Sequence, residues 1–372
     1  MTDDKKYIDW LTAILRNQRP KWPGTAKPES EQALWQAGLD HGVLALCHYG
    51  LSSCSLESTI PAGLRQKIKD FALRAAAAEI LLEMETGRIL LGFAKHQISY
   101  LLLKGTPLAY SIYPQAHLRL RCDTDILFPD RAAAEKAADL LIAQGYTRPP
   151  AKKGGDASYE FGCFRTDPMG VTHRIDIHWR INNNWVLARS MTYGELAAAA
   201  IPVPQLSPAA LTLSLPHTLI LCCLHRIAHK PYGDANRLLW LYDIHLICAK
   251  LNDAQWTEFT ALVIKKGLCD ICLDGLHQAR ICFDTTIPEP LENQLIESAA
   301  TERFNRDIGN SRTSMAIANF RALPGWKEKG LFLKEHLFPD TGYMLNKYNT
   351  RNRLLLPFLY IDRLMRGLGK LR

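Results

Sequence analysis

The sequence predicts an α+β fold in which a central unit of strands and helices lies between two helical regions. Residues 1–97 are rich in helix-forming residues and contain few helix breakers. Residues 98–182 contain short apolar, strand-like segments separated by turns, and helical periodicity dominates again in residues 183–372. We therefore expect an N-terminal helical region, an α+β core and a C-terminal helical domain over these three ranges.

The first two regions meet at a strand, a turn and a short helix. A long helix is predicted from about residue 64 to 97, and an apolar strand follows over Ile98–Leu103. The strand ends at the turn Lys104-Gly105-Thr106-Pro107. A short helix is then predicted over Leu108–Tyr113, with Pro107 suited to its first turn.

Strands and one helix alternate through the rest of the core. A strand is predicted over Leu118–Phe128 and an Ala-rich helix over Arg131–Gln144. Two further strands, Tyr159–Thr166 and Val171–Ile181, flank a β-turn at Asp167-Pro168-Met169-Gly170 and so form a hairpin. In the C-terminal domain, helices are predicted over residues 216–229, 235–250, 256–266 and 268–283.

Composition excludes several classes of protein. With 372 residues, of which 47% are hydrophobic and 22% charged, the chain can bury a sizeable globular core. It has no apolar run of about 18 residues, and its N-terminus lacks the pattern of a secretory signal, so a cytoplasmic location is expected. The ten cysteines are scattered, and the pair Cys269 and Cys272 lacks the second pair that a structural zinc site needs.

The net charge of +8 is concentrated in the C-terminal tail. Residues from Lys347 to Arg372 carry a net +6, which leaves +2 for the remaining chain and gives no general indication of nucleic-acid binding. One predicted helix in the tail separates apolar from basic side chains, which favours a docked helix, with weak contact to an anionic membrane surface as the alternative. The apolar stripe consists of Leu354, Phe358, Ile361, Met365 and Leu368.

Three carboxylates in the core point to metal chemistry. Side chains alternate along a strand, so Asp123 and Asp125 share one face, where their charges repel unless a cation or solvent lies between them. The alternating segment Arg174–Ile181 places Asp176 at mid-strand. Such a set is what two divalent ions require in phosphoryl transfer. The structural alternatives are an exposed edge strand for the pair and a salt bridge between Asp176 and neighbouring arginines.

The turn Lys104-Gly105-Thr106 adds a second element of such a site. A glycine at the start of a helix lets backbone N–H groups approach phosphates, and a lysine adds positive charge. Taken alone, the motif is typical of an ordinary turn. Its proximity to the Asp pair is what makes it a candidate for phosphate binding.

Taken together, these motifs resemble the uncharacterised bacterial nucleotidyltransferase family within the polymerase-β superfamily. The resemblance is specific over the core and extends less specifically into the helical half, at Leu224-His225 and from Arg237 to Asp243. In the core it is carried by Leu103-Lys104-Gly105, Tyr113-Pro114, Arg119, Asp123-Thr124-Asp125-Ile126-Leu127, Gly145-Tyr146 and Asp176-Ile177-His178-Trp179-Arg180.

The resemblance implies a small mixed-sheet nucleotidyltransferase core in which Asp123 and Asp125 bind Mg²⁺ or Mn²⁺ and Asp176 is the third catalytic and metal-binding carboxylate. Most of the superfamily has Gly-Ser or Gly-Gly where this chain has Lys-Gly-Thr. Either Thr106 therefore replaces the serine or Lys104 takes over the phosphate contact. The residues implied to contact the substrate are Lys104, Gly105, Thr106, Arg119 and His178.

The expected activity is transfer of a nucleoside monophosphate from a nucleoside triphosphate to an acceptor hydroxyl, with release of pyrophosphate. Its rival is a catalytically degenerate binding module that acts through the helical half and the basic tail. A toxin-like enzyme that modifies tRNA is a third alternative, for which the charge of the body gives little support. His225 and His229 share a helical face, without the glutamate of a His-Glu-x-x-His protease, and are predicted to pack within the helix or to contact nucleotide or acceptor.

Overall fold

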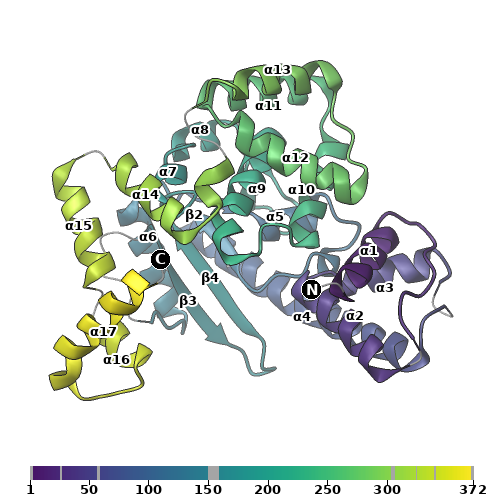
Figure 1. The fold of residues 1–372 in the computed structure, drawn as a ribbon, viewed down its shortest axis with the longest axis horizontal. Helices are drawn as coiled ribbons and strands as arrows, with labels where there is room; N and C mark the ends of the chain where they lie inside the picture. Colours follow the sequence, from purple (N-terminus) through teal and green to yellow (C-terminus); the bar gives the residue numbers. More distant parts are fainter. Residues whose placement is uncertain are drawn as a thin grey trace.

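The computed structural model describes residues 3–25, 27–56, 59–149, 159–302, 306–323, 325–338 and 341–369. It confirms the α+β fold class, because a six-stranded mixed sheet is surrounded by helices. Figure 1 shows α1–α3 at one end of the molecule, α15–α17 at the other, and the sheet between them. Among the described residues, no helix combines the length and the apolar character needed to span a bilayer.

Four α-helices form the described part of the N-terminal region. The long helix predicted from residue 64 is present as α4, which begins two residues earlier and also ends two residues earlier than expected. Its first half packs against α3, while Ile89, Leu90 and Phe93 near its end enter the core beneath the sheet. The four helices are α1 (Asp3–Leu15), α2 (Pro28–Asp40), α3 (Leu44–Ser53) and α4 (Ala62–Lys95).

The sheet has the strand order β3-β4-β2-β1-β6-β5. Neighbours β2 and β4, and likewise β1 and β6, run parallel, whereas the other pairs run antiparallel, so the sheet is mixed. Two strands, β5 and β6, lie beyond residue 182, in the range expected to be helical. The sequence did not predict them, because a strand of two residues is too short to show periodicity. The strands are β1 (Leu101–Leu103), β2 (Thr124–Leu127), β3 (Glu160–Thr166), β4 (Thr172–His178), β5 (Ile201–Pro202) and β6 (Leu211–Thr212).

The second strand is shorter than the sequence predicts. A 3₁₀ turn, η2 (Ala116–Leu118), occupies the start of the range expected for it, and β2 begins only at Thr124. Between the two, residues 119–123 form no strand, and Arg119 bonds the buried Asp243 of α10 (Leu238–Lys250). Asp123 consequently precedes β2 instead of lying within it.

Helices account for most of the remaining chain. The helix after β2 is present as α6, and the four helices predicted in the C-terminal domain are present as α9 to α12. After β1 come α5 (Gly105–Ser111), α6 (Arg131–Ala143), α7 (Trp185–Ala188), α8 (Tyr193–Ala198), α9 (Leu215–His229), η3 (Lys230–Tyr232), α10 (Leu238–Lys250), α11 (Asp253–Lys266), α12 (Cys269–Phe283), α13 (Glu289–Ala299), η4 (Arg306–Gly309), α14 (Arg312–Ala322), α15 (Trp326–Leu337), α16 (Thr341–Lys347), η5 (Arg353–Leu355) and α17 (Leu356–Gly369).

The two faces of the sheet belong to different hydrophobic cores. One face, with Leu102 and Ile126, packs with α4 and α6. The other face, with Leu103 and Leu127, belongs to the core that contains α9, α10 and α12. Because side chains alternate along β2, Asp125 projects to the same face as Leu127, on the side of the C-terminal helices. All ten cysteines are free, and seven of them are buried.

The predicted docking of the tail through its apolar stripe is wrong for the side chains that the structure describes. Leu354, Phe358, Ile361 and Met365 are 83%, 70%, 59% and 65% exposed. Helix α17 is held instead by another face, where the Tyr360 ring packs against Phe338 and Asp362 accepts a hydrogen bond from Tyr348. The side chain of Leu368 lies outside the described residues.

Candidate active site

Strand register brings the three predicted carboxylates and the lysine-bearing turn together. The parallel pairing of β2 with β4 places Asp125 directly beside Asp176. On the other side, the antiparallel pairing of β1 with β2 places Leu103 opposite Asp125, so Lys104 follows at the same end of the sheet. The negative charges of Asp125 and Asp176 both act on Asp123, which precedes β2 by one residue.

Asp125 is the centre of the cluster and is 6% exposed. Its Oδ1 accepts hydrogen bonds from Lys104 Nζ at 2.7 Å and from His178 Nε2 at 2.8 Å. Burial acts to raise the pKa of Asp125, but the positive charge of Lys104 and the hydrogen bond from His178 outweigh it and hold the pKa well below its usual range. Asp125 is therefore an anion in the folded protein.

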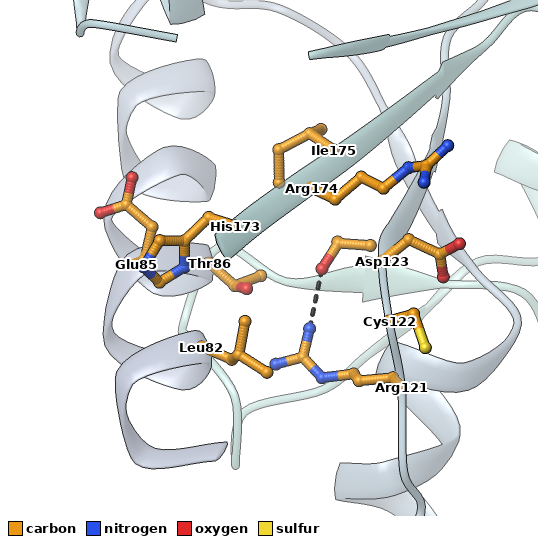
Figure 2. Close-up of a pocket in the computed structure, with 10 residues that line it drawn as sticks. Leu82, Glu85, Thr86, Arg121, Cys122, Asp123, His173, Arg174 and Ile175 are labelled. Atoms are coloured by element: carbon orange, nitrogen blue, oxygen red, sulfur yellow. Dashed lines mark hydrogen bonds between the residues drawn. The ribbon is translucent and has the colours of Figure 1, made fainter. Parts of the chain in front are cut away.

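The other two aspartates have fewer positively charged partners to balance their negative charge. Burial, together with the negative charges of Asp125 and Asp176, raises the pKa of Asp123 to about 6. Burial and the charge of Asp125 also raise the pKa of Asp176, although Arg174 Nε donates a hydrogen bond to its Oδ1 at 3.2 Å. In Figure 2, the Asp123 carboxylate and the Arg174 guanidinium point away from the α4 residues Glu85 and Thr86.

His178 joins Asp125 to a fourth carboxylate that the sequence reasoning missed. Its Nδ1 lies 3.1 Å from Oε2 of Glu160, which is opposite His178 in the β3–β4 register. Burial acts to lower the pKa of His178, but the hydrogen bonds to Asp125 and Glu160 raise it to about 9. The imidazole is therefore protonated near neutral pH and donates from both nitrogens. Counting back from the hairpin turn locates Glu160 only to within a residue, because register depends on the turn type.

A glycine in the same hairpin leaves room for Asp176. Gly162 is paired with Asp176 across β3 and β4. A β-carbon at Gly162 would lie 3.0 Å from Asp176 Oδ1, which is closer than a relaxed contact. The absence of a side chain there allows the carboxylate to lie over β3.

The turn after β1 has an unusual backbone. Lys104 has φ of 56° and ψ of −127°, in the positive-φ region that residues other than glycine rarely occupy. This conformation reverses the chain at the end of β1, and the lysine amine reaches Asp125 from there. Gly105 packs tightly, since a β-carbon there would lie 3.1 Å from the guanidinium of Arg119, closer than an ordinary contact.

Thr106 faces inward and away from solvent. Its side chain is 1% exposed, and its hydroxyl lies 3.4 Å from Thr124 Oγ1 and 3.2 Å from Arg121 Nη1. Arg121, which sequence reasoning did not select, also bonds Glu79 on α4 and so ties the turn to the long helix. Of the two alternatives for the phosphate contact, these bonds favour Lys104 over Thr106.

Arg119, predicted to contact substrate, is held by a buried partner in the helical domain. It is 7% exposed and forms a two-pronged ion pair with Asp243 of α10, at 2.8 Å from Nε and 2.7 Å from Nη2. Tyr113 donates a third hydrogen bond to the same carboxylate at 2.7 Å. The structure therefore places Arg119 behind the Gly105 turn, where it joins two parts of the molecule.

A small cavity lies next to Asp123 but is not a substrate site. It lies between α4 and the strand residues, and its lining includes Glu85, Arg121 and Ile175 (Figure 2). Its volume of about 10 Å³ is at the limit for one water molecule. The cavity is therefore too small to hold a nucleotide.

The donor chemistry of the cluster fits a divalent cation. Carboxylate oxygens are the ligands that Mg²⁺ prefers. Burial and mutual repulsion raise the pKa of Asp123 and Asp176, and a cation would relieve the repulsion. The side chains do not form a ready-made cage: within the described ranges, no group of three or more His, Cys, Asp or Glu residues is arranged to hold a metal ion. Further ligands would have to come from the phosphates of a substrate.

The mixed sheet with its carboxylate cluster and adjoining lysine is consistent with one class of protein, the nucleotidyltransferases. Comparison with known families is more specific. Residues 27–284 match the model of a family described as uncharacterised nucleotidyltransferase, so the chain belongs to that family. The match includes α2 to α12 and ends before α13. No curated protein matches the chain.

Proposed function

We propose that the protein is a metal-dependent nucleotidyltransferase that moves a nucleoside monophosphate from a nucleoside triphosphate to an acceptor hydroxyl. The observation that carries this proposal is the juxtaposition of Asp125 and Asp176 in adjacent parallel strands, with Asp123 and the amine of Lys104 beside them. Membership of the nucleotidyltransferase family supports the reaction class.

In this proposal, Asp123, Asp125 and Asp176 would hold Mg²⁺ or Mn²⁺, which would neutralise triphosphate charge. Lys104 exchanges its bond with Asp125 for a phosphate oxygen of the substrate. His178, held by Asp125 and Glu160, keeps the Asp125 carboxylate oriented. Asp176 either helps to hold a second metal ion or, in place of that role, accepts the proton of the acceptor hydroxyl. The acceptor oxygen forms a bond to the α-phosphorus, the bond from that phosphorus to the bridging oxygen breaks, and pyrophosphate leaves.

One observation favours the rival, a binding module without catalysis. Asp125 already has two positively charged partners, Lys104 and His178, which satisfy the carboxylate without a metal ion. If this arrangement is permanent, the protein binds no metal-nucleotide complex. Release of pyrophosphate that depends on metal and nucleoside triphosphate separates the two functions.

The test combines melting temperature with product analysis. Mg²⁺ or Mn²⁺ is expected to raise the melting temperature only when a nucleoside triphosphate is also present, because the carboxylates alone bind Mg²⁺ weakly. Incubation with each of the four triphosphates, labelled in the α-phosphate, and a cell extract should label one acceptor and release pyrophosphate. Both effects should vanish in Asp123→Asn/Asp125→Asn. A shift that persists in this double variant would place the metal site elsewhere, and absence of label with all four nucleotides would favour the binding module.

A further inference from the structure

Three aromatic side chains form a cluster on α9 and α10 that the proposed chemistry does not use. The ring centroids of His225 and His229 lie 4.4 Å apart, and those of His225 and Trp240 lie 4.6 Å apart. The centroid of His229 is 5.0 Å from that of Trp240, and the guanidinium of Arg237 lies 5.2 Å from the Trp240 ring. We call His225, His229 and Trp240 the aromatic cluster.

A series of contacts places the aromatic cluster next to the phosphate-binding turn. The guanidinium of Arg119 packs against Gly105 and pairs with Asp243 on α10. Trp240 precedes Asp243 by three residues, so the two side chains are neighbours on one face of that helix. Trp240 therefore lies on the face of α10 that is directed towards Gly105.

One face of α9 is also directed towards the Lys104-Gly105 turn. The charges of Asp243 and Arg119 both act on Cys222, and His225 lies three residues further along that face of α9. Burial, followed by the positive charge of Lys104, lowers the pKa of both His225 and His229. Both imidazoles are therefore neutral near pH 7 and lie within the electrostatic reach of Lys104.

The polar atoms of the aromatic cluster are not used in packing. Its three side chains are half-buried, and within the described part of the chain no hydrogen bond reaches their ring nitrogens. Other histidines of the same two helices differ, since Nδ1 of His217 lies 2.7 Å from the Ser214 hydroxyl and Nδ1 of His245 lies 3.0 Å from that of Thr285. The aromatic cluster thus offers ring surface together with free donors and acceptors.

We propose that the aromatic cluster binds the base of the nucleoside triphosphate whose phosphates contact Lys104. This inference rests on the proposed function and adds to it a site for the heterocycle. A flat aromatic base stacks on tryptophan and histidine rings, and neutral imidazoles donate to or accept from the base edge without adding charge. Trp240 packs against the same apolar core as Leu127, on the side of the sheet to which Asp125 projects, and the proposal places one ligand across both groups.

The experiment compares a ligand that has a base with one that lacks it. Binding of ATP, GTP, CTP and UTP, and of inorganic triphosphate, each with Mg²⁺, is measured by calorimetry for the unaltered protein, Trp240→Leu and His225→Gln. We expect Trp240→Leu to weaken binding of the preferred nucleotide by at least about fivefold, which corresponds to the lower end of the usual contribution of one base stacked on an aromatic side chain. Binding of inorganic triphosphate should change by less than about twofold, because the phosphate contacts remain.

Two further variants control for folding and for chemistry. His245→Gln changes a histidine on the same helix that bonds Thr285, and it should leave nucleotide affinity unchanged. Trp240→Phe keeps an aromatic face and should retain more affinity than Trp240→Leu. Melting temperatures verify that each variant is folded before its affinity is compared.

The outcomes separate this inference from the proposed function. Equal losses of nucleotide and inorganic triphosphate in Trp240→Leu, or no loss of either, would overturn the aromatic site while leaving the phosphate site intact. The same holds if the unaltered protein binds inorganic triphosphate as tightly as every nucleotide. If the unaltered protein binds neither kind of ligand, the proposed function fails together with the inference.

Discussion

At the residue scale, the three carboxylates of the candidate site differ in how far nearby positive charges balance their negative charge. Asp125 has two cationic partners and is held as an anion, whereas Asp123 and Asp176 are crowded by negative charge. A group with a lowered pKa is suited to hold positive charge, and one with a raised pKa is suited to accept a proton. We therefore propose different roles for chemically identical side chains, with Asp125 as a metal ligand and Asp176 as a metal ligand or base.

Asp176→Asn tests that assignment. The substitution removes one negative charge from a crowded cluster and preserves the shape of the side chain, so the melting temperature should hold or rise slightly. Nucleotide binding through Lys104 and the other two aspartates should largely survive. Turnover, measured as pyrophosphate release, should fall by at least about a hundredfold because the base or second metal ligand is lost.

Asp139→Asn is the matched control for this prediction. Asp139 is exposed on α6, so its substitution removes the same charge outside the site and should change neither stability nor turnover. The structural alternative for Asp176 is its hydrogen bond with Arg174. A destabilised Asp176→Asn protein with near-normal turnover per folded molecule would support that alternative and contradict the three-carboxylate site.

At the scale of elements, one buried ion pair adds to the apolar packing that connects the core with the helical domain. Arg119, on the segment before β2, and Asp243, on α10, are 7% and 3% exposed, and Tyr113 completes the network. Because the same contact positions α10 beside the Gly105 turn, it affects the geometry of the site as well as stability.

Asp243→Asn should be strongly destabilising. It leaves the guanidinium of Arg119 buried without its counter-charge, which costs roughly 3–5 kcal/mol in comparable buried pairs. Tyr113→Phe removes only a neutral hydrogen-bond donor from the same carboxylate and should cost about 1 kcal/mol. Chemical denaturation of both variants measures the difference, and similar losses for the two would show that the ion pair is not what holds the elements together.

At the scale of the whole molecule, the segment that matches the family model and the segment that carries most of the net positive charge are separate. The match ends at residue 284, whereas the positive charge is concentrated after residue 346, with helices α13 to α15 between them. The last helix adds an exposed apolar stripe to that basic segment. This surface lies apart from the residues of the candidate site in the sequence and can be altered independently of them.

Phe358→Ser/Ile361→Ser should leave stability nearly unchanged, within about 0.5 kcal/mol, because both side chains are already exposed. Met344→Ser, at a fully buried position of neighbouring α16, is the control and should be clearly destabilising. Denaturation curves give this comparison, and a large loss of stability in the double variant would support the docked arrangement.

Flotation with anionic vesicles tests the membrane alternative, which predicts salt-sensitive binding that the double variant lacks.

The sequence by itself determined the features that depend on local order. Alternation of polar and apolar residues located the β3–β4 hairpin and Asp176 within it, and helical periodicity located α4 and the helices from α9 to α12. It also selected Asp123, Asp125 and Lys104 as one group, because two aspartates at alternate positions share one face of an extended segment and the lysine follows a neighbouring strand of the same core. Each of these inferences needed only the periodicity of side chains along a helix or strand and the chemistry of those side chains.

Tertiary structure alone decided which partners the side chains meet. Arg119 pairs with Asp243 across 124 positions of sequence, and Glu160 meets His178 through a register that depends on the turn type. The sheet gains β5 and β6 because β1 offers an unpaired edge, which no periodicity within two-residue strands records. The aromatic cluster likewise exists only because α9 and α10 pack together. Such contacts depend on three-dimensional packing of distant segments, so a pattern read along the chain does not contain them.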